Sequence, residues 1–304
     1  MHKLGAELQA LIEKECSGKA YIKLTVGTLA DGEKTIQTFG ATGEIPNENY
    51  IYEIGSITKT FTTSLLAKYI HEDKMSLCDP ISKYIDGLDD NYYPTIKRLA
   101  THTAGYGYLP ATLWTGIKML LLASLLGSRN GGVLPDCLRV DEKRMKSLLL
   151  ENKKEDKDYA WAYSNFGIGL IGYAIGQVSG KGYFDTMNDF ITHELEMPNS
   201  YTGINPAKNL HGFTKKNKDI GNWDFEKTII SSAGDISATA GDMLIYAQKH
   251  MNAELPYLAL THQKHTTVRK GISNSGLAWI MIGEDNEIIA HKLFTTVLDD
   301  MKRN

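Results

Sequence analysis

The stretch Ile51–Thr60, I-Y-E-I-G-S-I-T-K-T, puts a serine and a lysine three residues apart, directly after a glycine. Residues three apart on a helix share one face, so the side chains of Ser56 and Lys59 are expected to meet. Gly55 allows the chain to turn tightly before the serine. A helix that begins at Ser56 is predicted by apolar residues at helical spacing: Ile57, Phe61, Leu65, Leu66 and Ile70.

Ser56 and Lys59 together have the chemistry of a nucleophile and its base. A serine hydroxyl is a poor nucleophile until a base takes its proton. A lysine in a partly buried, cation-rich cleft can have its pKa lowered enough to act as that base. The positive end of the helix dipole would also favour an oxyanion at this position. The competing interpretation is a helix cap followed by a surface lysine, because Ser-x-x-Lys also occurs by chance.

A second candidate motif, Ala162-Tyr163-Ser164-Asn165, stands at the start of a glycine-studded apolar segment. A tyrosine phenol can relay a proton to a leaving group. An asparagine amide can hold both a lysine and a substrate carbonyl. The alternative is a helix cap beside a core tyrosine.

The order of predicted elements favours an α+β fold. Asp31-Gly32 joins two alternating segments, 20–29 and 34–42, as a hairpin, and a second hairpin is predicted across residues 284–286. Helices are predicted at 111–126, 142–150, 166–178, 183–195 and Ser237–Met251. We therefore expect one domain over 1–304. Its antiparallel sheet would come from both chain ends (about 1–75 and 265–304), with an inserted helical lobe at about 76–264.

Composition excludes several classes of protein. The chain of 304 residues has a net charge of −3 and no basic block, which argues against nucleic-acid binding. Its most apolar run, Ile117–Leu126, is too short to span a bilayer. Three scattered cysteines argue against a disulfide framework or a zinc site, and no metal or cofactor is expected. The N-terminus predicts an amphipathic helix and no signal peptide, so the protein is expected to be cytoplasmic or an exported form whose leader has been removed.

Taken in order along the chain, these motifs resemble the serine β-lactamase and penicillin-binding-protein superfamily, most closely its class C-type branch. Further similar segments are Leu99–Gly105 (L-A-T-H-T-A-G), Ser232–Met243 (S-A-G-D-I-S-A-T-A-G-D-M) and Gly276–Trp279 (G-L-A-W). The resemblance implies a two-lobed β-lactamase-like fold. It also implies that Ser56 is the acylated nucleophile, Lys59 its activator, Tyr163 the general base and acid, and Asn165 a residue that orients substrate.

The third motif of that superfamily, Lys-Thr-Gly or His-x-Gly, is altered in this chain. His291 fits the first position, but Leu293 replaces the glycine, and only thirteen residues follow His291. By the resemblance, His291 helps to bind a substrate carboxylate, and the backbone N–H of Phe294 joins that of Ser56 in the oxyanion hole. The shortened C-terminus is expected to expose a sheet edge, which pairing with a second copy or a segment swap would cover.

Two functions remain open at this point. The first is a serine hydrolase that acts through an acyl-enzyme on a β-lactam, a D-Ala-D-Ala-type peptide or a small ester or amide. The second is a catalytically weak or inactive, truncated relative of penicillin-binding proteins that binds a ligand or a partner.

Overall fold

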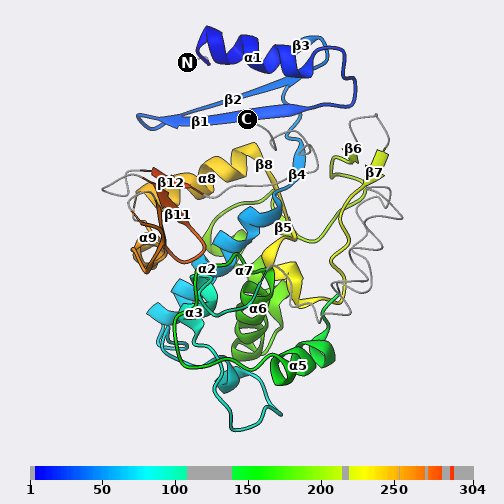
Figure 1. The fold of residues 1–304 in the computed structure, drawn as a ribbon. Coiled ribbons are helices and arrows are strands. Elements are labelled where there is room, and N and C mark those ends of the chain that lie inside the picture. Colours follow the sequence, from blue (N-terminus) through cyan, green and yellow to red (C-terminus); the bar gives the residue numbers. More distant parts are fainter. Residues whose placement is uncertain are drawn as a thin grey trace.

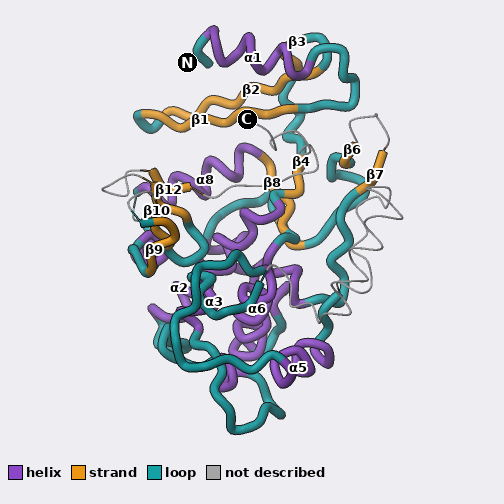
Figure 2. Tube along the Cα trace, in the orientation of Figure 1, coloured by secondary structure: helices purple, strands orange, loops and turns teal. Residues whose placement is uncertain are grey.

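The structure is a computed structural model that describes residues 4–107, 139–213, 219–252, 254–270, 273–282 and 288–290. A layer made of one helix and a long hairpin lies at one end of the molecule, and most of the helices lie at the other (Figure 1). Figure 2 shows the same division by element type, with the strands gathered in the upper half and most, though not all, of the helices in the lower half.

The N-terminal layer consists of α1 (Ala6–Cys16) packed on a three-stranded antiparallel sheet. Its strands are β1 (Leu24–Ala30), β2 (Glu33–Gly40) and β3 (Gly43–Ile45). Ala30 pairs with Glu33, so Asp31 and Gly32 form a two-residue turn, and both have positive φ as a type I′ turn requires. The first predicted hairpin is thus confirmed. Its sheet also contacts α8 (Ala240–Met251), where Gly27 lies against the side chain of Leu244.

A short central sheet, in the order β4-β8-β5, contains the first residues of the Ile51–Thr60 segment. It is formed by β4 (Ile51–Glu53), β5 (Tyr201–Thr202) and β8 (Ile236–Thr239). The predicted helix Ser237–Met251 is therefore too long at its start, because residues 237–239 pair with β4 and Ser237 also pairs with β5. The helix α8 begins at Ala240 and ends at Met251, and the Thr239 side chain caps it by accepting from the backbone N–H of Asp242.

The helical part contains the largest hydrophobic core, in which side chains of α2, α3, α5 and α6 meet. Its α-helices are α2 (Thr58–His71), α3 (Ile96–Ala100), α5 (Glu142–Glu151), α6 (Asn165–Ser179) and α7 (Tyr183–Asp189). Shorter turns are η1 (Gly55–Ile57), η2 (Ile81–Tyr84), η5 (Phe190–Glu194) and η6 (Ile229–Ala233). These bounds confirm the predicted helices at 142–150, 166–178 and 183–195; the one predicted at 111–126 lies outside the described residues.

The remaining strands complete the mixed α/β architecture. They are β6 (Gly212–Phe213) with β7 (Asp219–Gly221), and a four-stranded sheet in the order β12-β11-β10-β9. That sheet contains β9 (Thr266–Arg269), β10 (Ser273–Ser275), β11 (Ile280–Ile282) and β12 (Ile288–Ala290), preceded by η7 (Pro256–Leu258) and α9 (Ala259–His262). Among the described strands, no hydrogen bonds join this sheet to the N-terminal one. In the part of the chain that the structure describes, no helix is both long enough and apolar enough to cross a bilayer.

Candidate active site

The chain turns sharply at Gly55, between β4 and α2. Gly55 has φ of +47°, in the left-handed region that glycine adopts without strain. The turn η1 that follows runs directly into α2, so Ser56 lies at the start of a continuous helical segment. The N–H groups of a helix's first turn have no partners within the helix. The backbone N–H of Ser56 is therefore placed where it can donate to a ligand.

Two side chains predicted from the sequence, those of Lys59 and Tyr163, converge on the Ser56 hydroxyl. The Nζ of Lys59 lies 3.2 Å from Ser56 Oγ, as their spacing on one helix face predicts. The hydroxyl of Tyr163 approaches the same oxygen from the loop before α6, at 2.7 Å. Lys59 Nζ also lies 4.7 Å from the centroid of the Tyr163 ring. Each of the three groups therefore contacts the other two.

Lys59 is fully buried, and its burial changes its acid–base chemistry. Its Nζ donates a hydrogen bond of 2.7 Å to the carbonyl of Ala233 in η6. No carboxylate among the described residues forms an ion pair with it. Removal of the charged amine from water, without a compensating anion, lowers the pKa of Lys59 to about 7. A large fraction of the amine is thus neutral near neutral pH and able to accept a proton.

Tyr163 is held in place by the loop that contains His102. His102 has φ of +61°, and its carbonyl accepts from the N–H of Ala162 at 2.9 Å. The Nδ1 of His102 accepts from the N–H of Ser164 at 3.3 Å. The two bonds flank Tyr163, whose ring centroid lies 5.0 Å from that of His102. The Leu99–Gly105 segment therefore holds Tyr163 in position.

The other predicted site residues are placed less completely. Asn165 is the first residue of α6 and is buried, yet among the described residues its amide makes no hydrogen bond to Lys59. His291 and Phe294 lie outside the described residues, so their roles stay predictions.

The carbonyl of Ala233, which accepts from Lys59, was not singled out by the sequence. The only signal for it was the similarity of Ser232–Met243 to a superfamily segment, which does not say which atom matters. Within the described ranges, no group of three or more histidine, cysteine or acidic side chains is arranged to hold a metal ion. The chemistry that these contacts support is proton transfer from a serine nucleophile.

Comparison with known proteins finds that the chain resembles one family. The family model described as Beta-lactamase matches residues 15–283. A beta-lactamase of Pseudomonas fluorescens is 24% identical over 282 residues, which are 85% of this chain and 69% of that protein. The D-alanyl-D-alanine-carboxypeptidase/endopeptidase AmpH of Escherichia coli K12 is 24% identical over 223 residues, 69% of this chain and 51% of AmpH.

Solved structures show the same fold. A class C beta lactamase from Rhodobacter sphaeroides superposes with a TM-score of 0.71 at 19% identity, over 91% of this chain and 74% of that one. An octameric penicillin-binding protein homologue from Pyrococcus abyssi gives a TM-score of 0.69 at 22% identity, over 90% of this chain and 64% of that one. The predicted β-lactamase-like fold is thereby confirmed. The chain spans about half the length of several curated relatives that it matches.

Proposed function

The chain belongs to the beta-lactamase family, and from that premise we propose that it is a serine hydrolase that forms an acyl-enzyme at Ser56. One observation carries the proposal: Lys59 Nζ and the Tyr163 hydroxyl, from separate elements, both lie within hydrogen-bond reach of Ser56 Oγ. A nucleophile in contact with a base of suitable pKa is the arrangement that activates a serine.

The proton transfers follow from these contacts. Neutral Lys59 takes the Ser56 proton as the oxygen attacks a carbonyl, and the resulting ammonium remains bound to the carbonyl of Ala233. Tyr163 supplies a proton to the leaving group and takes one in turn from the Lys59 ammonium. The backbone N–H of Ser56 donates to the oxyanion, with that of Phe294 as its proposed second donor. Water then hydrolyses the acyl-enzyme.

The proposed substrates are a β-lactam, a D-Ala-D-Ala-type peptide, or a small ester or amide. The names of the relatives, beta-lactamase and D-alanyl-D-alanine-carboxypeptidase/endopeptidase, support this range. All of these substrates present an acyl carbon to the serine. Asn165 and His291 are the proposed residues that orient them.

Intact-protein mass spectrometry tests the proposal. The protein is mixed with a penicillin and, separately, with a small activated ester, and Ser56→Ala serves as the control. We expect a mass increase equal to the acyl group, lasting or transient, that is absent in Ser56→Ala. Adduct formation by Ser56→Ala would overturn the assignment of the nucleophile. No adduct with either reagent would favour the alternative of a weak or inactive relative that binds a ligand or partner.

A second proposal concerns assembly. Among the described strands, β12 and β1 each stand at the end of their sheet, and unpaired strand edges favour association. A homo-oligomer or a segment swap through these edges is the proposed result. Sedimentation velocity tests it, and a stable monomer at all accessible concentrations would contradict it.

A further inference from the structure

A series of hydrogen bonds joins α7 and α2 to the part of η6 that contacts the catalytic lysine. The carbonyl of Ala233 accepts from Lys59, and the carbonyl of the preceding residue, Ser232, lies 2.6 Å from Thr62 Oγ1. The hydroxyl of Tyr183 lies 2.7 Å from the same Thr62 oxygen. A carbonyl can only accept, so Thr62 donates its one proton to the carbonyl of Ser232, which is nearer than that of Thr58 at 3.3 Å, and Tyr183 donates to Thr62. These hydrogen bonds therefore link Tyr183 through Thr62 to η6.

Lys59 and Thr62 are three residues apart on α2 and share one face of it. They bind two consecutive carbonyls of η6, those of Ala233 and Ser232. The position of η6 against α2 thus depends on both bonds. A shift of the Ser232 carbonyl would also move the Ala233 carbonyl, because one residue joins them.

Close packing fixes the other side of η6. A Cβ at Gly172 would lie 2.3 Å from the Cβ of Ser232, so α6 approaches η6 as closely as glycine permits. A Cβ at Gly176 would lie 2.8 Å from the backbone nitrogen of Tyr183, so the start of α7 is held in the same way. The backbones around Ser232 and Tyr183 are therefore tightly confined.

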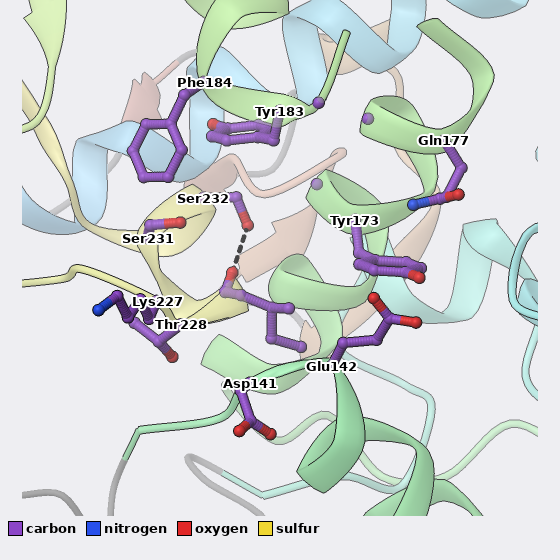
Figure 3. A pocket seen from close by; sticks show the side chains of 14 residues that line it. Asp141, Glu142, Tyr173, Gln177, Tyr183, Phe184, Lys227, Thr228, Ser231 and Ser232 are labelled. Atoms are coloured by element: carbon purple, nitrogen blue, oxygen red, sulfur yellow. Dashed lines mark hydrogen bonds between the residues drawn. The ribbon is translucent and has the colours of Figure 1, made fainter. Parts of the chain in front are cut away.

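The ring of Tyr183 packs on α6, where a Cβ at Gly172 would lie 3.2 Å from its Cδ2. It borders a cavity of about 330 Å³ between α6, α7 and η6. Figure 3 shows Tyr183 and Phe184 on one side of this cavity and Tyr173 and Gln177 on the other. The hydrogen bond to Thr62 is the polar contact that joins the Tyr183 hydroxyl to α2, on a ring that otherwise borders this cavity.

We propose that Tyr183 is a positioning residue for the catalytic lysine: through Thr62 it holds the carbonyls of η6 that keep Lys59 beside Ser56. The inference rests on the proposed function, since it assigns a consequence to the role of Lys59 as activator. It adds a residue of α7 that contacts neither the nucleophile nor the lysine.

The consequence of losing the Tyr183 hydroxyl has a definite sign. If the carbonyl of Ala233 moves away, the charged form of Lys59 loses its acceptor while remaining buried. The pKa of Lys59 then falls further below its ordinary value. Acylation needs the neutral amine, so its rise with pH would shift to lower pH. The maximal rate would fall as well, because the amine is less well placed.

The test compares Tyr183→Phe with Tyr173→Phe, a matched change on the opposite wall of the cavity, where the hydroxyl interacts with Glu142. Acylation is followed as a function of pH. We expect a five- to tenfold lower plateau and a shift of the rise by about half a pH unit in Tyr183→Phe. Tyr173→Phe should leave both unchanged. Identical profiles for Tyr183→Phe and the wild type would overturn the inference.

Titration of Lys59 by NMR in protein labelled with [ε-¹³C]lysine needs no activity. It therefore decides the inference even if the wild type acylates nothing, a result that would refute only the proposed function. Thr62→Val removes the same hydrogen-bonded link between Tyr183 and η6 at its middle residue. Its shift should match that of Tyr183→Phe, and the double variant should add little to either. A Lys59 titration that is unchanged in both single variants would refute the positioning role.

Discussion

The hydroxyl of Tyr163 lies 2.7 Å from Ser56 Oγ, although 107 residues separate the two along the chain. Lys59 reaches the same oxygen from the next turn of the helix. The contact between Lys59 and Ser56 is local. The contact between Tyr163 and Ser56 depends on the whole helical part of the fold.

Lys59→Ala should lower the acylation rate by roughly two to four orders of magnitude, because the serine loses its base. Lys68→Ala is the matched control: Lys68 is on the same helix but forms ion pairs with Glu72 and Glu194. Rapid-mixing kinetics with a chromogenic ester would measure both, and circular dichroism would confirm folding. An unchanged rate in Lys59→Ala would make this lysine purely structural.

Burial of Lys59 should also make stability depend on pH. The pKa of Lys59 is about 7 in the folded chain and about 10.4 when unfolded. Between these values the unfolded chain binds the extra proton, so the free energy of unfolding should rise with pH. In Lys59→Met this contribution is absent. Urea unfolding at several pH values should show the wild type gaining stability relative to Lys59→Met from about pH 7 to about pH 10. If the difference in free energy of unfolding between the wild type and Lys59→Met did not change with pH, the low pKa of Lys59 would be contradicted.

A half-buried histidine pair should limit stability in acid. His250 Nδ1 lies 3.1 Å from His262 Nε2, and His250 also contacts Ser64 and Trp279. Burial and the neighbouring His262 lower the pKa of His250 to about 3. The unfolded chain binds the proton first, below about pH 6.5, so stability should fall from there toward pH 3.

The variant His250→Phe should lose less stability over that pH range than the wild type. His193→Gln changes an exposed histidine and is the control. The measurement is the melting temperature at pH steps down to about 3. Equal acid sensitivity in His250→Phe and the wild type would exclude the pair as its source.

Gly172→Ala should destabilise the protein in spite of its helical position. Alanine gains about 1 kcal/mol over glycine in a helix, whereas overpacking costs about 1–3 kcal/mol. Here the new methyl would lie 2.3 Å from Ser232 Cβ and 2.4 Å from its Oγ, and a Cβ has no rotamer that moves it away. The clash should therefore prevail.

Denaturant unfolding of Gly172→Ala should show a lower midpoint, together with slower acylation because η6 carries the acceptor of Lys59. Gly107→Ala, where a Cβ meets nothing within 4 Å, should be close to neutral. A Gly172→Ala variant as stable as the wild type would mean that α6 and η6 can separate without cost.

Much of the local structure could be read from the sequence. The hairpin at Asp31-Gly32 follows from residues that tolerate positive φ, and the helical ranges follow from apolar periodicity. The start of α8 was misplaced because Ser237 and Thr239 are both good caps, and only pairing with β4 and β5 shows that the first residues form a strand. His291 and Phe294 lie outside the described residues, so the third motif stays a prediction.

The sequence by itself determined that Ser56 and Lys59 share a helix face, since three-residue spacing on a helix is a matter of backbone geometry. The tertiary structure decided the rest of the site. Tyr163 reaches Ser56 only because α6 packs beside α2, and Lys59 has a lowered pKa because tertiary packing buries it. Burial and contacts between distant segments depend on how the whole chain packs, and no local spacing encodes them.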